Sequence, residues 1–259
     1  MSKLWLPPRH AAEKLGMDRR TFLGGCLGAS LITGAGALTA LALAGCDSKG
    51  PKSAAGLLAA SERFNEKLER ALFRHTAMNF APPGAQLAGA AFPSYFIAAS
   101  VPVWDERERG VWRLEVGGAV AHPLRLTLGD LMRLPRTELR LEHFCVEGWS
   151  AVSVRTGVRL SELARLVGLT PEVRYVDFQS FDDDYHESWD LESALHPQTL
   201  IVYGQDGAPL GPAFGAPARV YSPVKLGYKN TKYLTRILFL PEKNGGYWSD
   251  QGYEWYGGV

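Results

Sequence analysis

Most of the chain after about residue 110 consists of short alternations of apolar and polar residues, separated by glycine, proline and acidic turns. Side chains two residues apart on a strand lie on the same face, so this pattern predicts half-buried strands. The expected strands are 111–116, 123–126, 139–144, 151–154, 175–180, 199–203, 218–221 and 235–240. Helical patterns are short, at 128–134 and 160–167, with a turn or short helix at 191–194. Many short strands with few helices predict an α+β domain.

The first 46 residues differ from the rest in charge. They hold five Lys or Arg against two acids, whereas the remainder has two more acidic than basic residues. The pair Arg19-Arg20 is followed by Phe22 and Leu23 and opens an uncharged stretch that lasts until Asp47. This arrangement is typical of a twin-arginine export signal. A retained transmembrane helix is the alternative, since about 20 apolar residues can span a bilayer.

The uncharged stretch ends in Leu43-Ala-Gly-Cys46, which is similar to a lipoprotein box. Cleavage before Cys46 would leave its thiol and amine to be acylated, and ordinary signal-peptidase cleavage is the alternative. Asp47 resembles the residue that keeps some lipoproteins in the inner membrane of Gram-negative bacteria. The sequence therefore predicts an exported protein, periplasmic or on the outer face of the cytoplasmic membrane, with a lipid anchor at Cys46.

Residues 47–88 are expected to form a tether and a short helix. Gly50-Pro51 is a helix breaker within a stretch of small residues. Further along, the segment 61–74 has Phe64, Leu68 and Leu72 at helical spacing with charges opposite, and Ser61 is a candidate N-cap. The C-terminal stretch 245–259 has aromatic residues among glycines and no regular period, so it is expected to wrap the surface.

Composition excludes several functional classes. The net charge of +1 leaves no basic surface of the kind that binds nucleic acid. Two of the three cysteines, Cys26 and Cys46, lie in the export segment, so the body has Cys145 alone. A single thiol rules out an internal disulfide framework and a Cys-x-x-Cys metal site.

Cys145 follows the alternating segment 139–144 and precedes a Glu-Gly turn. Three interpretations are open. It could pack as a small hydrophobe. It could be a nucleophile, since His143 lies on the same side of the strand and could act as its base. It could also be a thiolate ligand to a soft or high-valent metal. One protein ligand cannot hold a metal alone, so the last case requires an organic cofactor that supplies the other ligands.

A basic segment supports a phosphate-bearing cofactor. Arg219, Lys225, Lys229 and Lys232 surround a glycine-containing loop, and no acid occurs in residues 207–234. Arginine side chains and exposed backbone N–H groups bind phosphate well. A solvated basic loop is the alternative interpretation.

The motifs Cys145-Val-Glu-Gly-Trp-Ser150, Leu195-His-Pro-Gln-Thr-Leu200, Gly215-Ala-Pro-Ala-Arg219 and Lys225-Leu-Gly-Tyr-Lys-Asn-Thr-Lys232 resemble the sulfite oxidase superfamily of molybdopterin enzymes. The resemblance extends over about residues 90–241 and is greatest to the bacterial branch containing the periplasmic methionine sulfoxide reductase catalytic subunits. It implies a mixed α+β molybdopterin-binding domain at 89–259, without the dimerisation domain of eukaryotic sulfite oxidases. A monomer is therefore expected.

By this resemblance, Cys145 ligates molybdenum and is the catalytic residue. Phe92 and Phe214 depart from the reductase pattern, because they stand where that enzyme has asparagines that contact the cofactor. Ser180 replaces a cofactor-binding threonine. The expected cofactor contacts are Tyr95, Phe96, Ser180, Arg219, Lys225, Lys229, Asn230, Thr231 and Lys232.

The resemblance implies oxygen-atom transfer with a molybdenum–molybdopterin cofactor, in the direction of reducing an S-oxide such as methionine sulfoxide, free or in a protein. Electrons would come from a membrane haem or quinol-linked partner. Two alternatives are a sulfite dehydrogenase with a cytochrome acceptor and a non-catalytic lipoprotein that uses the fold for binding.

Overall fold

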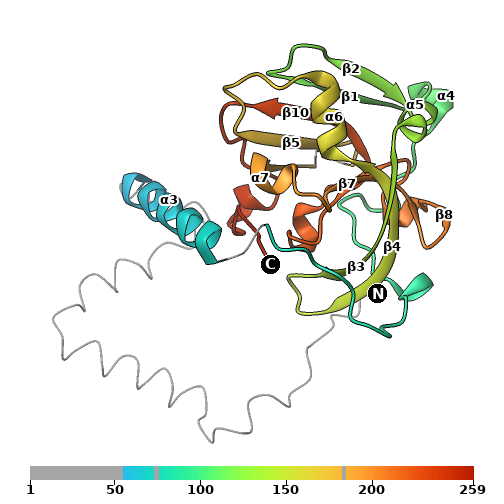
Figure 1. Ribbon diagram of the computed structural model, residues 1–259, viewed down its shortest axis with the longest axis horizontal. Helices are drawn as coiled ribbons and strands as arrows, with labels where there is room; N and C mark the ends of the chain where they lie inside the picture. The colour runs from blue at the N-terminus through green and yellow to red at the C-terminus, as the bar shows by residue number, and fades with distance from the viewer. Residues whose placement is uncertain (1–54, 73–75, 183–184) are drawn as a thin grey trace, which may run out of the picture. The chain divides into compact units, whose positions relative to one another are not determined.

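The computed structural model describes residues 55–72, 76–182 and 185–259 (Figure 1). The predicted twin-arginine signal, the lipoprotein box at Cys46 and the breaker at Gly50-Pro51 lie outside these residues. Within the described ranges, every helix is too short or too polar to cross a membrane.

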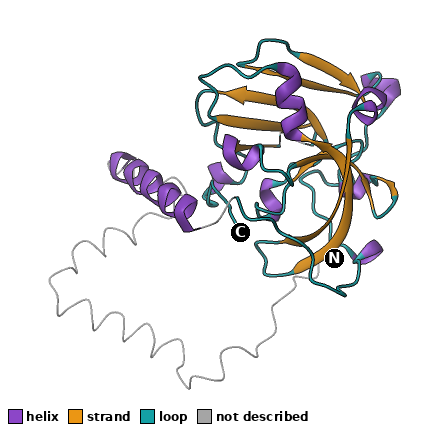
Figure 2. Ribbon diagram, viewed as in Figure 1, coloured by secondary structure: helices purple, strands orange, loops and turns teal. Residues whose placement is uncertain are grey.

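The strands are β1 (Arg113–Gly118), β2 (Leu124–Thr127), β3 (Arg136–Phe144), β4 (Ser150–Arg159), β5 (Tyr175–Ser180), β6 (His186–Asp190), β7 (Leu200–Gln205), β8 (Ala208–Pro209), β9 (Arg219–Tyr221) and β10 (Leu234–Leu240). They form two sheets, with the orders β2-β1-β10-β5-β6 and β3-β4-β7-β8; β9 pairs with β7 (Figure 2). β1 and β10 are parallel, and the other strand pairs are antiparallel.

The helices are α3 (Ala55–Leu72), α4 (Glu106–Arg109), α5 (Leu128–Arg133), α6 (Leu160–Val167) and α7 (Leu191–Ala194). Short 3-10 turns occur at η2 (Gly89–Ala91), η3 (Pro212–Phe214), η4 (Gly227–Lys229) and η5 (Ser249–Gln251). α6 has its predicted bounds, and α5 begins after a capping box between Thr127 and Asp130. Ser61 is not an N-cap, because the alanines and leucines before it continue α3 toward Ala55.

The main core lies where α6 packs on the strands. Leu160, Leu163 and Val167 of α6 are fully buried with Leu114, Val176 and Ile237 of the first sheet. A second, smaller cluster holds Leu141, Leu200, Val202, Leu210 and Tyr221 of the other sheet. Apolar burial of this kind contributes roughly 25 cal/mol per Å², so the two clusters fix how the sheets meet.

Two strands differ from the sequence-based prediction. β4 has ten residues where only 151–154 was expected, because it continues as the partner of both β3 and β7. β6 was not predicted, since its sequence His-Glu-Ser-Trp-Asp is mostly polar. Glu187, Ser188 and Asp190 are nevertheless buried, and each has a hydrogen-bond partner. β6 therefore carries buried polar groups into the first sheet.

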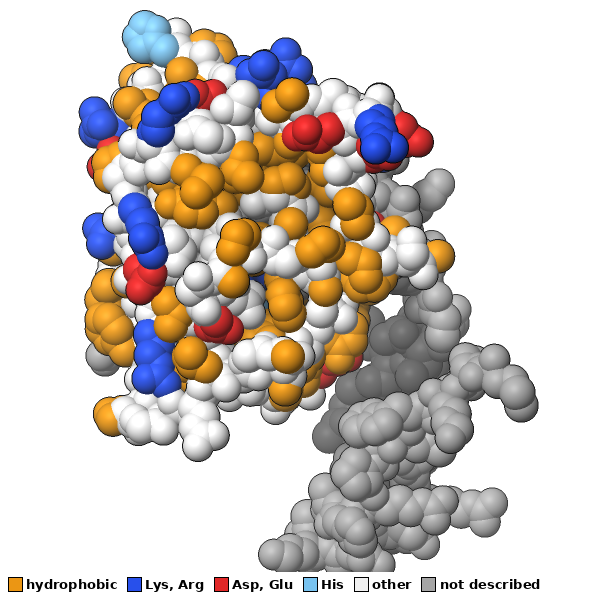
Figure 3. Space-filling view, turned by 90° about the vertical axis from the view of Figure 1, so that its right-hand side faces the viewer, with side chains coloured by type: hydrophobic (Ala, Val, Ile, Leu, Met, Phe, Trp, Pro, Cys, Tyr) orange, Lys and Arg blue, Asp and Glu red, His pale blue; other side chains and the backbone are white. Residues whose placement is uncertain are grey.

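One face of the molecule has hydrophobic side chains over its middle and charged side chains toward its edges (Figure 3). Among the described residues, Tyr95, Val103 and Val111 are exposed large hydrophobics of the body. Single exposed apolar residues are normal on soluble domains, so they carry no conclusion by themselves.

Candidate active site

Cys145 lies directly after β3, in the turn that joins it to β4. The Cys145 N–H donates to the Trp149 carbonyl, and the Gly148 N–H donates to the Cys145 carbonyl, both at 3.0 Å. Gly148 has a φ of 84°, which favours glycine. The turn thus satisfies its own backbone and presents the thiol beyond the end of the hairpin. Cys145 is half-buried and lines a cavity of about 490 Å³, so it is not a core thiol.

The cavity is built from segments that are far apart in the sequence. They are the early loop 92–97, the hairpin end 143–149, the end of β5 with the residues after it, the segment 213–233 and the C-terminal stretch 247–253. Tyr95, Phe96, Ser180, Arg219, Asn230 and Lys232, which were predicted as cofactor contacts, all line this cavity together with Cys145.

Two cations of the cavity wall have no ion-pair partner among the described residues. The Arg219 guanidinium donates to the carbonyls of Asn230 at 2.8 Å and Phe214 at 3.2 Å. Burial, and then the charge of Arg155, lowers its pKa to about 9. The Lys232 ammonium donates to the Ala213 carbonyl at 3.1 Å, and burial, followed by Arg219, lowers its pKa to about 7. Unpaired buried cations favour binding of an anion.

Arg155 is not part of the cavity wall, but its positive charge acts on Arg219 and His143, which are, and the sequence analysis did not identify it. Its side chain is fully buried, with the guanidinium carbon 4.8 Å from the Phe92 ring centroid and 4.7 Å from that of Tyr221. It donates to Gln205, and in the described residues its Nε and Nη2 groups have no hydrogen-bond partner. The sequence signal that could have identified it was a charged residue within the strand-forming segment that is now β4.

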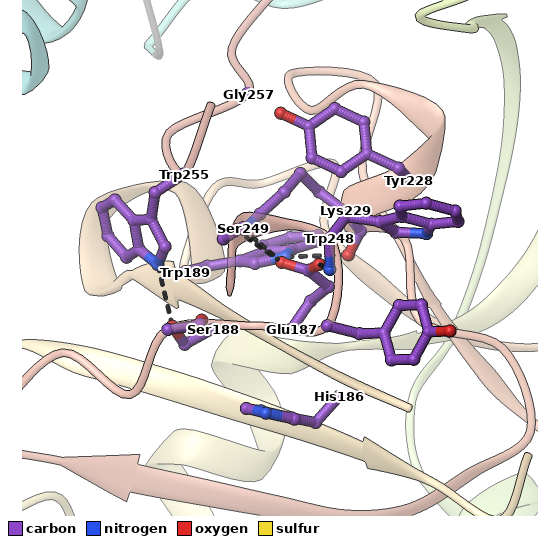
Figure 4. Close-up of polar contacts among 12 residues, drawn as sticks. His186, Glu187, Ser188, Trp189, Tyr228, Lys229, Trp248, Ser249, Trp255 and Gly257 are labelled. Carbon is purple, nitrogen blue, oxygen red and sulfur yellow. Dashed lines mark hydrogen bonds and ion pairs between the residues drawn. The ribbon is translucent and has the colours of Figure 1, made fainter. Parts of the chain in front are cut away.

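Lys225 and Lys229, which were also expected to contact a cofactor, are not among the residues that line the cavity. The Lys225 ammonium lies 2.8 Å from an Asp190 carboxylate oxygen, and the Lys229 ammonium lies 2.5 Å from one of Glu187. All four side chains are fully buried. The physical reason is β6, the unpredicted strand, which supplies a carboxylate to each lysine. Figure 4 shows the pair of Glu187 and Lys229.

Asn230 and Thr231, the next two predicted cofactor contacts, differ in their position relative to the cavity. The Asn230 carboxamide accepts from the Ser222 N–H at 2.7 Å and donates to the carbonyls of Lys225 and Leu226, so it holds the loop in shape while it lines the cavity. Thr231 is fully buried and is not part of the cavity wall. The expected contact of Thr231 with the cofactor therefore has no support from the geometry.

A carboxylate ties the early loop to the end of β5. The Asp182 side chain accepts from the backbone N–H groups of Ile97 and Ala98, both at 2.9 Å. The Ser180 hydroxyl accepts from the Asp182 N–H at 2.9 Å. This link brings Tyr95 and Phe96 onto the wall, with Tyr95 at the exposed rim.

His143 lines the cavity within an aromatic cluster. Its ring lies 5.4 Å from Phe92, 5.5 Å from Trp149 and 5.7 Å from Tyr221, measured between centroids. Burial, and then Arg219, lowers its pKa to about 3, so the imidazole is neutral. Burial also raises the pKa of the Cys145 thiol. These directions oppose the thiolate–imidazolium pair that a cysteine nucleophile needs.

The C-terminal stretch corrects a second expectation. It does not only wrap the surface: Tyr247, Trp248 and Tyr253 line the cavity, and Trp255 and Tyr256 are buried. Glu187 holds this stretch, because its carboxylate accepts from the Trp248 N–H at 2.9 Å and the Ser249 hydroxyl at 3.3 Å (Figure 4). The same carboxylate binds Lys229, so one buried group joins β6, the basic segment and the tail.

The donor set fits a metal held within an organic, phosphate-bearing cofactor. Across the described ranges, no group of three or more His, Cys, Asp and Glu could hold a metal alone. The cavity instead offers one soft thiol, Cys145, aromatic walls, and the cations Arg219 and Lys232, which pair with no acid in the described part of the chain. A thiolate suits a soft or high-valent metal, and buried cations suit a phosphate.

Comparison with known proteins agrees with this site. The family described as "oxidoreductase molybdopterin binding domain" matches residues 98–248. A putative protein-methionine-sulfoxide reductase subunit, YedZ1 of Azospira oryzae, is 37% identical over 83% of this chain and 81% of that protein. The protein-methionine-sulfoxide reductase catalytic subunit MsrP of Xanthomonas axonopodis pv. citri is 33% identical over 54% of this chain and 48% of that protein, so the match spans about half of its length.

Among solved structures, the sulfane dehydrogenase SoxCD of Paracoccus pantotrophus shares the fold, with a TM-score of 0.51 and 22% identity over 56% of this chain and 41% of that one. Because the family match extends over more than half of the residues, the chain belongs to the oxidoreductase molybdopterin-binding family and is a molybdopterin-dependent enzyme of the sulfite oxidase type, with the mixed α+β fold that its sequence predicted.

Proposed function

We propose that this enzyme transfers an oxygen atom and works in the direction of reducing an S-oxide, with methionine sulfoxide as the representative substrate. The observation that carries the proposal is the position of Cys145, the one cysteine after the export segment, on the wall of a cavity with two unpaired cations. The names of the relatives YedZ1 and MsrP support the direction and the substrate.

In this proposal, Cys145 would ligate the molybdenum, and Arg219 and Lys232 would hold the phosphate end of the cofactor. When bound, the molybdenum–molybdopterin cofactor supplies two-electron oxygen-atom transfer. The protein contributes orientation and electrostatics. Arg155 and Arg219 keep the cavity positive, and the neutral His143 adds no further charge. Phe92 and Phe214, whose ring centroids lie 6.0 Å apart, give the wall an apolar side that excludes water.

The mouth of the cavity suits a thioether-derived substrate. Tyr228, Tyr247, Trp248 and Tyr253 line the cavity, as does Tyr95, whose side chain is exposed. A thioether sulfur gains about 0.3–1.5 kcal/mol from contact with an aromatic ring, so these rings would favour a methionine side chain. An exposed rim leaves room for a methionine sulfoxide that is part of a protein chain.

The site's location and partners also belong to the proposal. Arg19-Arg20 and the box ending in Cys46 support twin-arginine export and a lipid anchor in the envelope, with the protein as a monomer. Several relatives are named as subunits, which supports a separate electron-donating partner, membrane-bound and haem- or quinol-linked.

The test is to purify the protein from a host that makes molybdopterin, measure its molybdenum, and compare two assays. Reduction of methionine sulfoxide by a reduced dye should be fast, and oxidation of sulfite by a cytochrome should be slow. The reverse ranking would make the enzyme a sulfite dehydrogenase. A folded protein without molybdenum would contradict the proposed reaction and would favour the alternative of a non-catalytic binding lipoprotein.

A further inference from the structure

Tyr233 lies between Lys232 and the start of β10, and it lines the cavity. Only 1% of the residue is exposed to solvent. Its hydroxyl is buried and has no hydrogen-bond partner among the described residues. A buried polar group without a partner destabilises a fold, so such groups are rare and need an explanation. The hydroxyl of Tyr233 is therefore a candidate contact of a molecule that binds in the cavity.

The backbone of Tyr233 has an unusual conformation. Its φ is 57°, in the left-handed region that a bulky residue rarely adopts. Two hydrogen bonds fix it there: its N–H donates to the Gly215 carbonyl at 3.3 Å, and its carbonyl accepts from the Phe181 N–H at 3.0 Å. Neighbouring side chains of an extended segment point to opposite sides, whereas Lys232 and Tyr233 both line the cavity. Backbone strain of this kind occurs most often at ligand-binding and catalytic sites.

The surroundings of Tyr233 favour an anionic acceptor. The Lys232 ammonium is 5.4 Å from the centroid of the Tyr233 ring. Burial, followed by the charge of Asp182, raises the pKa of the phenol to about 12, and Arg219 acts in the opposite direction. The hydroxyl is therefore protonated at neutral pH and can donate a hydrogen bond. A donor beside Lys232 suits the same phosphate that we propose for Lys232 and Arg219.

Tyr221 provides a comparison within the same molecule. Its hydroxyl is also buried, and the described part of the chain gives it no hydrogen-bond partner. Tyr221 lies on β9 against the guanidinium of Arg155, and it is not among the residues that line the cavity. The two tyrosines share an unsatisfied hydroxyl and differ in their access to the cavity. An effect on a bound cofactor should therefore be confined to Tyr233.

We propose that Tyr233 is a cofactor-binding residue, whose hydroxyl donates a hydrogen bond to the phosphate end of the cofactor. Arg219 and Lys232 supply charge to that phosphate, and Tyr233 supplies a neutral donor with a fixed direction. The inference rests on the proposed phosphate-holding role of Arg219 and Lys232. It is independent of the substrate and of the direction of the reaction.

The test is Tyr233→Phe in the full-length protein, which removes the hydroxyl and keeps the ring. Molybdenum and pterin contents of the purified holoenzyme are followed during dialysis. Release of the cofactor should become about tenfold faster or more, because a hydrogen bond to a charged group is lost. Protein from a host without molybdopterin should melt about 2 °C higher or more, since the variant has one unsatisfied buried group fewer.

Tyr221→Phe is the matched control. It should also raise the melting temperature of the cofactor-free protein, and it should leave the rate of cofactor release unchanged. Titration of the cofactor-free protein with inorganic phosphate then identifies the acceptor. Tyr233→Phe should weaken phosphate binding by about tenfold, and Tyr221→Phe should not change it.

Release of the cofactor from Tyr233→Phe at the parent rate would overturn the proposal. A lower melting temperature of this variant would do the same, because the hydroxyl would then have a partner within the protein. Equal acceleration of release by Tyr221→Phe would also contradict it. Faster release with unchanged phosphate affinity would overturn the choice of the phosphate as acceptor.

Lys232→Met separates this inference from the proposed function on which it rests. If Lys232→Met releases the cofactor faster and Tyr233→Phe does not, the phosphate site stands and only the role of Tyr233 fails. If neither variant changes release, the proposed phosphate site fails as well. The substrate assays have no part in either outcome, so failure of the proposed reaction is measured separately.

Discussion

The basic segment 219–232 contains two pairs of cations in different surroundings. Lys225 and Lys229 point to β6 and are neutralised by Asp190 and Glu187 in buried ion pairs. Arg219 and Lys232 point to the cavity, where the described residues give them no ion-pair partner. The first pair joins the basic segment to β6, and the second is the pair for which we propose an anionic partner. The comparison teaches that a charge-rich segment has no single function, because neighbouring strands decide which charges are used internally.

The difference has a physical basis in the cost of burying charge. A buried ammonium is tolerated when a carboxylate and further hydrogen bonds satisfy it, as they do for Lys225, which also donates to the Tyr256 carbonyl at 2.6 Å. Burial lowers the pKa of both lysines, to about 8 for Lys225 beside its carboxylate and to about 7 for Lys232, which has no ion-pair partner among the described residues. That state is what the proposed role of Lys232 in holding the phosphate end of the cofactor would require.

The largest effect should come from Cys145→Ser. This variant tests whether the reaction takes place in the cavity that Arg219 and Lys232 line. We expect turnover to be abolished, because the oxygen of serine is a poor replacement for a soft thiolate. The melting temperature should stay close to that of the parent, since Cys145 is on the cavity wall and not in the core. Full turnover by this variant would refute the ligand role.

Lys229→Met tests the structural side. It leaves Glu187 buried without its cation, so chemical denaturation should show a loss of about 3–5 kcal/mol in the free energy of unfolding. The matched control is the double variant with Glu187→Leu, which removes the orphaned charge and should recover much of that loss. If Lys229→Met were as stable as the parent, the paired lysines would contribute no more to stability than the cations of the cavity.

Lys232→Met is the counterpart on the cavity side. The molybdopterin content of the purified protein should fall, with cofactor affinity reduced by about tenfold to a hundredfold, as for residues that support a bound metal group. The cofactor-free protein should not lose stability, because Lys232 has no ion pair to lose among the described residues. Lys232→Arg is the control and should retain most of the cofactor.

The smallest expected effect is a pH dependence of the cofactor-free protein. Lys232 has a folded pKa of about 7, below the 10.5 of the free side chain, so between these values the unfolded chain binds more protons. Stability should therefore rise as the pH is raised from about 7 toward 10 and fall as it is lowered. Lys232→Met should flatten this slope in urea titrations at several pH values, and an unchanged slope would assign it to other groups.

Sequence patterns predicted some parts of the site and missed others. The hairpin end at Cys145 follows from local alternation and a Glu-Gly turn, and the structure places the thiol on the wall of a cavity. β6 carries buried polar side chains whose partners come from other segments, so no local hydrophobic pattern could reveal it. The ion pairs of Lys225 and Lys229 were missed for the same reason, because their carboxylates lie on that strand.

By itself, the sequence determined the short strands and helices, the single thiol of the body and the kinship with molybdopterin enzymes, because periodicity, composition and motifs are local properties. Only the tertiary structure decided which charges form ion pairs and that the C-terminal stretch reaches the cavity. It also decided that the apolar side chains of α3 are exposed. Those outcomes depend on contacts between residues far apart in the chain, such as Glu187 with Lys229 and Trp248. The free energy of a buried charge is set by such contacts and not by its neighbours in sequence.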